Sequence, residues 1–198
     1  MLFASGKEPA KVREAGLAKW YYSLTDADRV KLGRYLDYAD ASSKGAFMAS
    51  VEMQAVEDHN YAFAVLVGEH ALAESLTPAE RFSANEGLVL AYFNLPDYDS
   101  CVAACDTGLA QLRDPAVMEA LRAKNRGQLP AVLHCRSCKL NVVVGVRYDY
   151  DEGERILDQY LADGLIDAEE LFYRKQSIKI FRLQKTFDGI YAIKEKDQ

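Results

Sequence analysis

The chain has 198 residues, of which 49% are hydrophobic and 27% charged, and its formal net charge is −6. This composition is typical of a globular protein, and the acidic balance argues against nucleic-acid binding by the whole surface. No apolar run is long enough to span a membrane, the first residues lack the apolar segment of a signal peptide, and four cysteines do not indicate a disulfide framework. We therefore expect a single compact cytoplasmic domain.

The first 41 residues predict a pair of helices. Residues 8–23 predict one helix, which carries Trp20, and Thr25 begins a second helix as its N-cap. Trp20 is either a ligand-stacking residue or part of a helix pair that covers the end of a longer array. We favour the second interpretation, because the terminal element of a stacked array must bury an otherwise open face.

Two further helix pairs are predicted between residues 42 and 112. The first pair covers residues 42–57 and 60–75. The second begins at Thr77-Pro78-Ala79-Glu80, which has the N-cap, the first-turn proline and the third-position glutamate of a helix start. Leu95-Pro96-Asp97 ends that helix, and its partner helix runs to Leu112.

The remaining residues predict five more helices, at 114–126, 129–146, 149–163, 167–183 and 186–194. Gly164 is the expected C-cap of the third of these. The run Val142-Val143-Val144 has strand propensity, but a lone strand would leave its backbone groups unpaired, so we predict helix there. The fold class is therefore all-α, with about 10–11 helices.

A short motif recurs at the start of several predicted helices. An aromatic residue is followed three positions later by a small one, at Tyr61 and Ala64, Tyr98 and Cys101, and Tyr150 and Gly153; at Phe187, Ile190 takes the place of the small residue. The aromatic would anchor the turn, and the small residue would let two helices approach closely. The intervals between the aromatics are 37, 52 and 37 residues, and the helix predicted at 114–126 accounts for the longer one.

This pattern resembles degenerate tetratricopeptide repeats over roughly residues 43–191. In the best copy, Tyr92, Tyr98 and Cys101 stand where the family usually has Tyr, Tyr and Ala. The resemblance implies a right-handed superhelical array of antiparallel helix pairs. An N-terminal capping pair would cover residues 1–41 and the repeats residues 42–198.

The strongest chemical candidates are the cysteines. The cysteines form two pairs, each spaced so that both members lie on one face of a helix, and their thiolates could bind zinc: Cys101, Cys105, Cys135 and Cys138. We favour packing instead, because Cys101 takes the small-residue position of its motif and a buried cysteine behaves as a small hydrophobe. No phosphate-binding or catalytic motif is found. We therefore expect neither an enzyme nor a cofactor.

Charge alternates along the C-terminal third of the chain. Residues 121–148 carry +6, residues 149–170 carry −8 and residues 171–187 carry +5. In the family that the chain resembles, the first helix of each repeat lines a concave groove. We therefore predict a partly basic groove for an acidic or C-terminal peptide, lined by Arg81, Asn85, Arg136, Lys139, Asn141, Lys175, Lys179 and Arg182. The alternative is that these charges solvate exposed faces and pair with the acidic helix between them.

These observations favour a non-catalytic protein–protein interaction scaffold or adaptor. A first alternative is an RNA-binding helical repeat, in which Phe172, Tyr173 and Phe181 would stack on bases, although the net charge and the expected burial of Phe181 argue against it. A second alternative is a self-associating regulatory subunit, in which the acidic helix of one copy meets the basic groove of another. The sequence leaves all three open.

Overall fold

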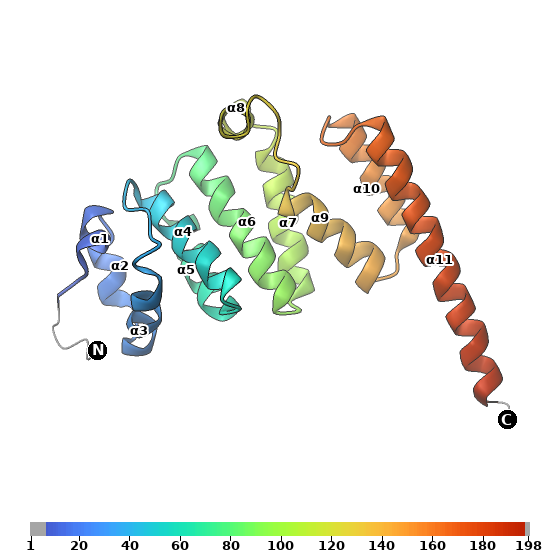
Figure 1. The fold of residues 1–198 in the computed structure, drawn as a ribbon, viewed down its shortest axis with the longest axis horizontal. Helices are drawn as coiled ribbons and strands as arrows, with labels where there is room; N and C mark the ends of the chain where they lie inside the picture. Colours follow the sequence, from blue (N-terminus) through green and yellow to red (C-terminus); the bar gives the residue numbers. More distant parts are fainter. Residues whose placement is uncertain (1–6, 197–198) are drawn as a thin grey trace. The chain divides into compact units, whose positions relative to one another are not determined.

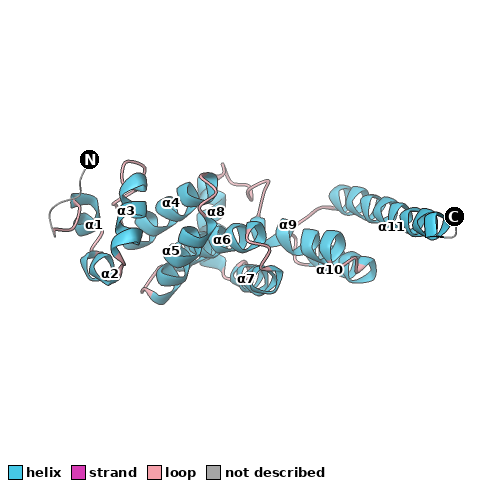
Figure 2. Ribbon diagram, turned by 90° about the horizontal axis from the view of Figure 1, so that it is seen from below, coloured by secondary structure: helices cyan, strands magenta, loops and turns pink. Residues whose placement is uncertain are grey.

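The computed structural model describes residues 7–196, and side chains over residues 7–188. The described residues form eleven α-helices and one π-helix, and no strand occurs among them (Figure 2). The prediction of an all-α chain is therefore confirmed. The chain divides into two compact units, Met1–Cys138 and Lys139–Gln198, and each is described by itself.

Three short helices open the first unit: α1 (Ala10–Glu14), α2 (Ala18–Ser23) and α3 (Asp26–Tyr35). The prediction of one helix over residues 8–23 is wrong, because Gly16 between α1 and α2 adopts a φ of +72°. This left-handed conformation ends a helix, and glycine adopts it without steric cost. The predicted N-cap is confirmed, since the Thr25 side chain accepts a hydrogen bond from the backbone N–H of Asp28.

Five helices follow in the same unit: α4 (Lys44–Glu57), α5 (Tyr61–Ala73), α6 (Pro78–Asn94), α7 (Tyr98–Gln111) and α8 (Pro115–Lys124). Helices α4 and α5 pack on each other and on α6, and α6 also packs on α7 and α8 (Figure 1). The start of α6 is a capping box formed by Thr77 and Glu80, as predicted. Asp97 and Asp114 cap α7 and α8 with their side chains.

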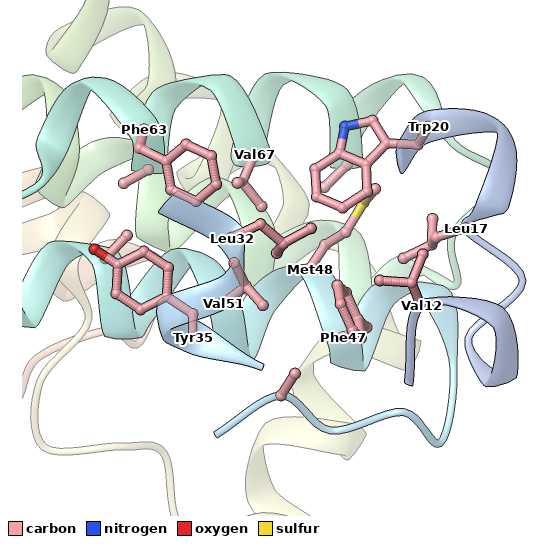
Figure 3. Close-up of a cluster of buried hydrophobic side chains, with 14 of the residues drawn as sticks. Val12, Leu17, Trp20, Leu32, Tyr35, Phe47, Met48, Val51, Phe63 and Val67 are labelled. Carbon is pink, nitrogen blue, oxygen red and sulfur yellow. The ribbon is translucent and has the colours of Figure 1, made fainter. Parts of the chain in front are cut away.

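The N-terminal helices share one hydrophobic core with α4 and α5 (Figure 3). Trp20 is only 3% exposed, and its ring stacks on that of His70 with 5.6 Å between centroids. The edge of Phe47 contacts it from α4. Trp20 is therefore a core residue, which confirms that it packs in the fold rather than facing a ligand.

The second unit contains the π-helix η1 (Asn141–Val146), α10 (Tyr150–Ala162) and α11 (Ala168–Lys196), and α9 (His134–Leu140) crosses the boundary between the two units. The helix predicted at 129–146 starts only at His134, because Pro130 lacks a backbone N–H and a side chain of α6 caps the later start. The helices predicted at 167–183 and 186–194 are one continuous helix. No glycine or proline separates them, and the Thr186 hydroxyl donates to the Arg182 carbonyl inside the helix.

The recurring motif marks three helix starts. Tyr61, Tyr98 and Tyr150 are the first residues of α5, α7 and α10. The small residues that follow them, Ala64, Cys101 and Gly153, are all buried. A Cβ added at Gly153 would lie 2.4 Å from Cγ2 of Val144, which confirms a close approach of two helices. Phe187 lies inside α11 and begins no helix, so the fourth copy of the motif is wrong, and the side chain of Ile190 lies outside the described residues.

Candidate functional site

Three of the residues predicted to bind a partner lie in the first unit and donate hydrogen bonds to its backbone carbonyls. The Arg81 guanidinium donates to the Leu72 and Glu74 carbonyls at 2.9 and 3.3 Å, at the C-terminal end of α5. Asn85 is buried and donates to the Ala104 carbonyl at 2.8 Å. Arg136 is also buried and donates to the Ala131 carbonyl. Both side chains are therefore buried in the first unit, and Asn85 also lines a shallow depression over α5, α6 and α7.

The other five predicted residues lie in the second unit. Lys139 on α9 is half-buried, and Asn141 on η1 is exposed. On α11, Lys175 pairs with Asp158 at 2.5 Å and Arg182 pairs with Asp151 at 2.6 Å, so both cations face acidic residues of α10. Lys179 is exposed. For Lys175 and Arg182, the structure therefore matches the alternative in which basic residues pair with the neighbouring acidic helix.

The opposite face of α11 is apolar and exposed. Five large side chains there, between 56% and 61% exposed, form what we name the α11 stripe: Phe172, Tyr173, Ile180, Leu183 and Phe187. At about 100° per residue, they fall within roughly 100° of arc on the helix. Ile178, which is buried, and the paired Lys175 and Arg182 lie on the far side of the helix, towards α10.

Phe181 lies outside this arc, and it is 54% exposed. The expectation that Phe181 is buried is therefore wrong. Its backbone carbonyl accepts a hydrogen bond from the Tyr150 hydroxyl of α10 at 3.5 Å. The sequence contained the spacing of the stripe but did not reveal which face of α11 the rest of the chain covers.

A buried acid, Glu52, lies at the centre of the first unit. Its side chain extends from α4 into a slot beside two glycines: a Cβ added at Gly68 or Gly87 would lie 2.1 or 2.4 Å from the carboxyl group. Neither carboxyl oxygen has a hydrogen-bond partner within the described part of the chain. Burial raises the pKa of Glu52 well above its ordinary value, which favours the neutral carboxyl group.

A second buried acid, Glu86, caps the start of a helix. The Glu86 carboxylate, from α6, accepts hydrogen bonds from the backbone N–H groups of His134 and Cys135 at 2.6 and 2.8 Å. These amides have no partner within their own helix, because they belong to its first turn. Glu86 therefore fixes the start of α9 against α6.

The four cysteines come together where α7 meets α9, and all are buried and reduced. The sulfur of Cys101 is hydrogen-bonded to those of Cys105 and Cys138. The hydrogen bonds with Cys101, together with burial, raise the pKa values of Cys105 and Cys138, and burial raises that of Cys135. Across residues 7–188, no group of three or more His, Cys, Asp or Glu side chains has the arrangement needed to hold a metal ion. The burial of these thiols fits the packing interpretation.

Two open depressions mark the surface of the first unit. One, of about 370 Å³, lies over α5, α6 and α7, and its lining includes Glu69, Leu88 and Tyr92. The Tyr92 hydroxyl donates to Glu69 at 2.8 Å, and burial together with this bond raises the Tyr92 pKa. The other, of about 530 Å³, lies along α8 and includes Met118 and Arg122. Both are shallow surfaces rather than enclosed sites.

Comparison of the chain with protein-family models, curated proteins and solved structures found no match. Among the described helices, none is both long enough and apolar enough to cross a membrane.

Proposed function

We propose that this chain is a non-catalytic protein-interaction scaffold whose helix pairs are tetratricopeptide-like repeats in a right-handed superhelix. The repeat assignment is supported by α4–α5 and α6–α7, in which a tyrosine starts the second helix and a small residue at its first turn is buried. The observation that carries the functional proposal is the α11 stripe.

An apolar face of this size is comparable to the largest apolar patch on a typical monomer, and such patches are often functional. A large aromatic side chain has about 200 Å² of surface, so the five half-exposed side chains of the stripe present on the order of 500 Å². Contiguous apolar patches above a few hundred Å² mark sites of interaction on soluble proteins. The stripe is therefore the surface where we place the partner.

The buried titratable groups support a role without catalysis. Glu52 lies between α4, α5 and α6, Glu86 caps α9, and the cysteines fill the contact between α7 and α9. Acid–base catalysis requires such groups to face a substrate. In this fold, each of these buried groups contacts a neighbouring helix and contributes to the packing of the helices.

The partner that fits the stripe is a helix with its own apolar face. Apolar anchors on one helix recur at three- and four-residue steps, and a second helix buries such a row along its whole length. Lys179 is exposed and lies at the edge of the stripe. Among the eight residues predicted from the sequence, Lys179 is the one that we retain in the binding surface.

Affinity capture from native extract with the tagged full-length protein tests this proposal. The captured protein is identified by mass spectrometry, purified and titrated against the wild type and two matched variants. Phe187→Asp changes a residue of the stripe and should weaken binding at least tenfold, because it puts a charge where the partner would bury an apolar side chain. Phe181 is similarly exposed but lies outside the arc of the stripe, so Phe181→Asp should bind the partner as the wild type does. Equal effects of the two variants, or no protein that rebinds in purified form, would contradict the proposal.

RNA binding remains the alternative, because Phe172, Tyr173 and Phe181 are all exposed and could stack on bases. The cations of α11 are less suited to binding RNA phosphates, because Lys175 and Arg182 are paired with acidic residues of α10. Titration of labelled single-stranded RNA at physiological salt decides between the two. Strong binding that falls steeply with added salt would replace the scaffold proposal.

A further inference from the structure

We infer that the depression over α5, α6 and α7 is a second interaction surface, which binds a basic segment of a partner protein through a lysine or arginine side chain. This surface is separate from the α11 stripe, because the depression lies in the first unit and α11 in the second. Its volume of about 370 Å³ falls within the range of roughly 300–1,000 Å³ that is usual for ligand sites, so it is large enough for a bound side chain.

The floor of this depression is apolar and its walls carry polar groups. Leu88 of α6 and Ala104 of α7 are buried in the floor, and Leu72 of α5 is half-buried beside them. Ser100 and Thr107 add hydroxyl groups along α7. Lysine and arginine suit such a surface, because their aliphatic stems pack on apolar side chains while the charged ends reach polar groups.

The charge around the depression is negative. The two helices that form its walls, α5 and α7, contain three acidic residues, Glu69, Asp99 and Asp106, and no lysine or arginine. Residues 45–112, which cover most of α4 to α7, have ten acidic residues and a single cation, Arg81, so their formal net charge is −9. Two of these acids are buried, and the other eight are exposed or half-buried. A surface of this charge attracts a basic segment and disfavours an acidic one.

Glu69 is the group that would pair with the incoming cation. It is exposed, and its Oε1 accepts a hydrogen bond from the Tyr92 hydroxyl at 2.8 Å, so the carboxylate is held at the edge of the depression. Over residues 7–188, no lysine or arginine pairs with this carboxylate. A carboxylate accepts several hydrogen bonds, so Oε2 can accept from an ammonium or guanidinium group.

Selection from a random peptide library against the purified full-length protein tests this inference, followed by titration of the selected peptides by fluorescence anisotropy. We expect selected peptides that carry arginine or lysine beside apolar residues, and their binding should weaken with added salt, because exposed charges are screened. Citrulline in place of the arginine, or acetyl-lysine in place of the lysine, removes the charge and should weaken binding by about fivefold or more.

Two matched pairs of variants locate the contact. Ala103→Phe fills the depression and should weaken binding by about tenfold or more, whereas Ala110→Phe, at an exposed position two turns later on α7, should leave it unchanged. Glu69→Gln keeps an acceptor for Tyr92 but removes the charge, and it should weaken binding by about threefold to tenfold. Glu57→Gln, at an exposed acid of α4, changes the net charge equally and is its control. Circular dichroism checks that all four variants keep the helical content of the wild type.

Three results would overturn the inference: selected peptides that are acidic or uncharged, a library that yields no binder, or binding that Ala103→Phe leaves unchanged. Peptides whose binding is lost with Phe187→Asp but not with Ala103→Phe would support the α11 stripe and overturn the second surface. The outcome for the depression is therefore distinguishable from that for the proposed function.

Discussion

Glu52 is the residue whose surroundings depart most from expectation. A carboxyl group without a hydrogen-bond partner is costly to bury, and an ionised one is far more costly. Two glycines on neighbouring helices make room for it, and burial raises its pKa, which favours the protonated form. The fold thus accommodates this acid by neutralising it rather than by pairing it with a cation.

This arrangement predicts a specific dependence of stability on pH. Below pH 4.5, the ordinary pKa of glutamate, Glu52 is protonated in both the folded and the unfolded chain. As the pH rises above that value, only the unfolded carboxyl ionises, so the free energy of unfolding should fall by about 1.4 kcal/mol per pH unit until the folded pKa is reached. Glu52→Gln has no carboxyl group to ionise at this position. The free energy of unfolding of Glu52→Gln, minus that of the wild type, should therefore increase from pH 4.5 to neutral pH. Urea unfolding of both proteins across that range measures the difference, and a constant difference would show that Glu52 does not titrate in this way.

The close approach of Gly87 to the Glu52 carboxyl group predicts that substitutions at these two positions have coupled effects on stability. Gly87→Ala places a Cβ 2.4 Å from the Glu52 Cδ, so we expect it to destabilise the wild type by about 1–3 kcal/mol. In the background of Glu52→Ala the obstruction is gone, and the same change should cost little. A double-mutant cycle by denaturant unfolding measures the interaction. Additive effects would mean that the two side chains do not meet.

At the scale of elements, α9 depends on a distant side chain. Glu86 accepts from two first-turn amides of α9, and its charge complements the positive end of the helix dipole. Glu86→Ala should therefore destabilise the protein by about 1–3 kcal/mol and increase hydrogen exchange at the amides of residues 134 and 135. Glu119→Ala, an exposed acid on α8, is the matched control and should have little effect. Unchanged exchange at the start of α9 would contradict the capping role.

The second unit depends on the close contact at Gly153. A Cβ at this position would meet Cγ2 of Val144 at 2.4 Å and Cδ1 of Ile178 at 3.3 Å, so Gly153→Ala should cost about 1–3 kcal/mol. Gly145 in η1 has open space where a Cβ would go. Gly145→Ala should therefore be neutral or slightly stabilising. Thermal unfolding of the two variants compares them, and equal effects would argue against the packing described for α10.

Local signals in the sequence predicted most helix boundaries, because they act over a few residues. The capping box at Thr77 and the motif tyrosines placed α5, α6, α7 and α10 correctly. The break at Gly16 and the continuity of α11 were missed, since a glycine can sit within a helix or end it, and an aromatic motif can start a helix or lie inside one. The predicted groove was drawn from charge runs. A charge run does not reveal that Asn85 and Arg136 are buried or that Lys175 and Arg182 face α10.

For the molecule as a whole, the charge alternation between residues 149 and 187 describes an internal contact. Lys175 and Arg182 of α11 meet Asp158 and Asp151 of α10, and exposed ion pairs of this kind contribute little stability each. These cations and the buried Ile178 are on the side of α11 that faces α10. The apolar stripe is thereby left on the outer face of the helix.

The central claim is that another polypeptide covers this face, and site-specific photocrosslinking in native cells tests it most directly. A photoreactive phenylalanine analogue replaces Phe187, within the stripe, or Phe181, outside it, and the two positions have nearly equal exposure. We predict a discrete crosslinked protein adduct from position 187 and none from position 181. No adduct at 187, or equal adducts from both positions, would contradict the account.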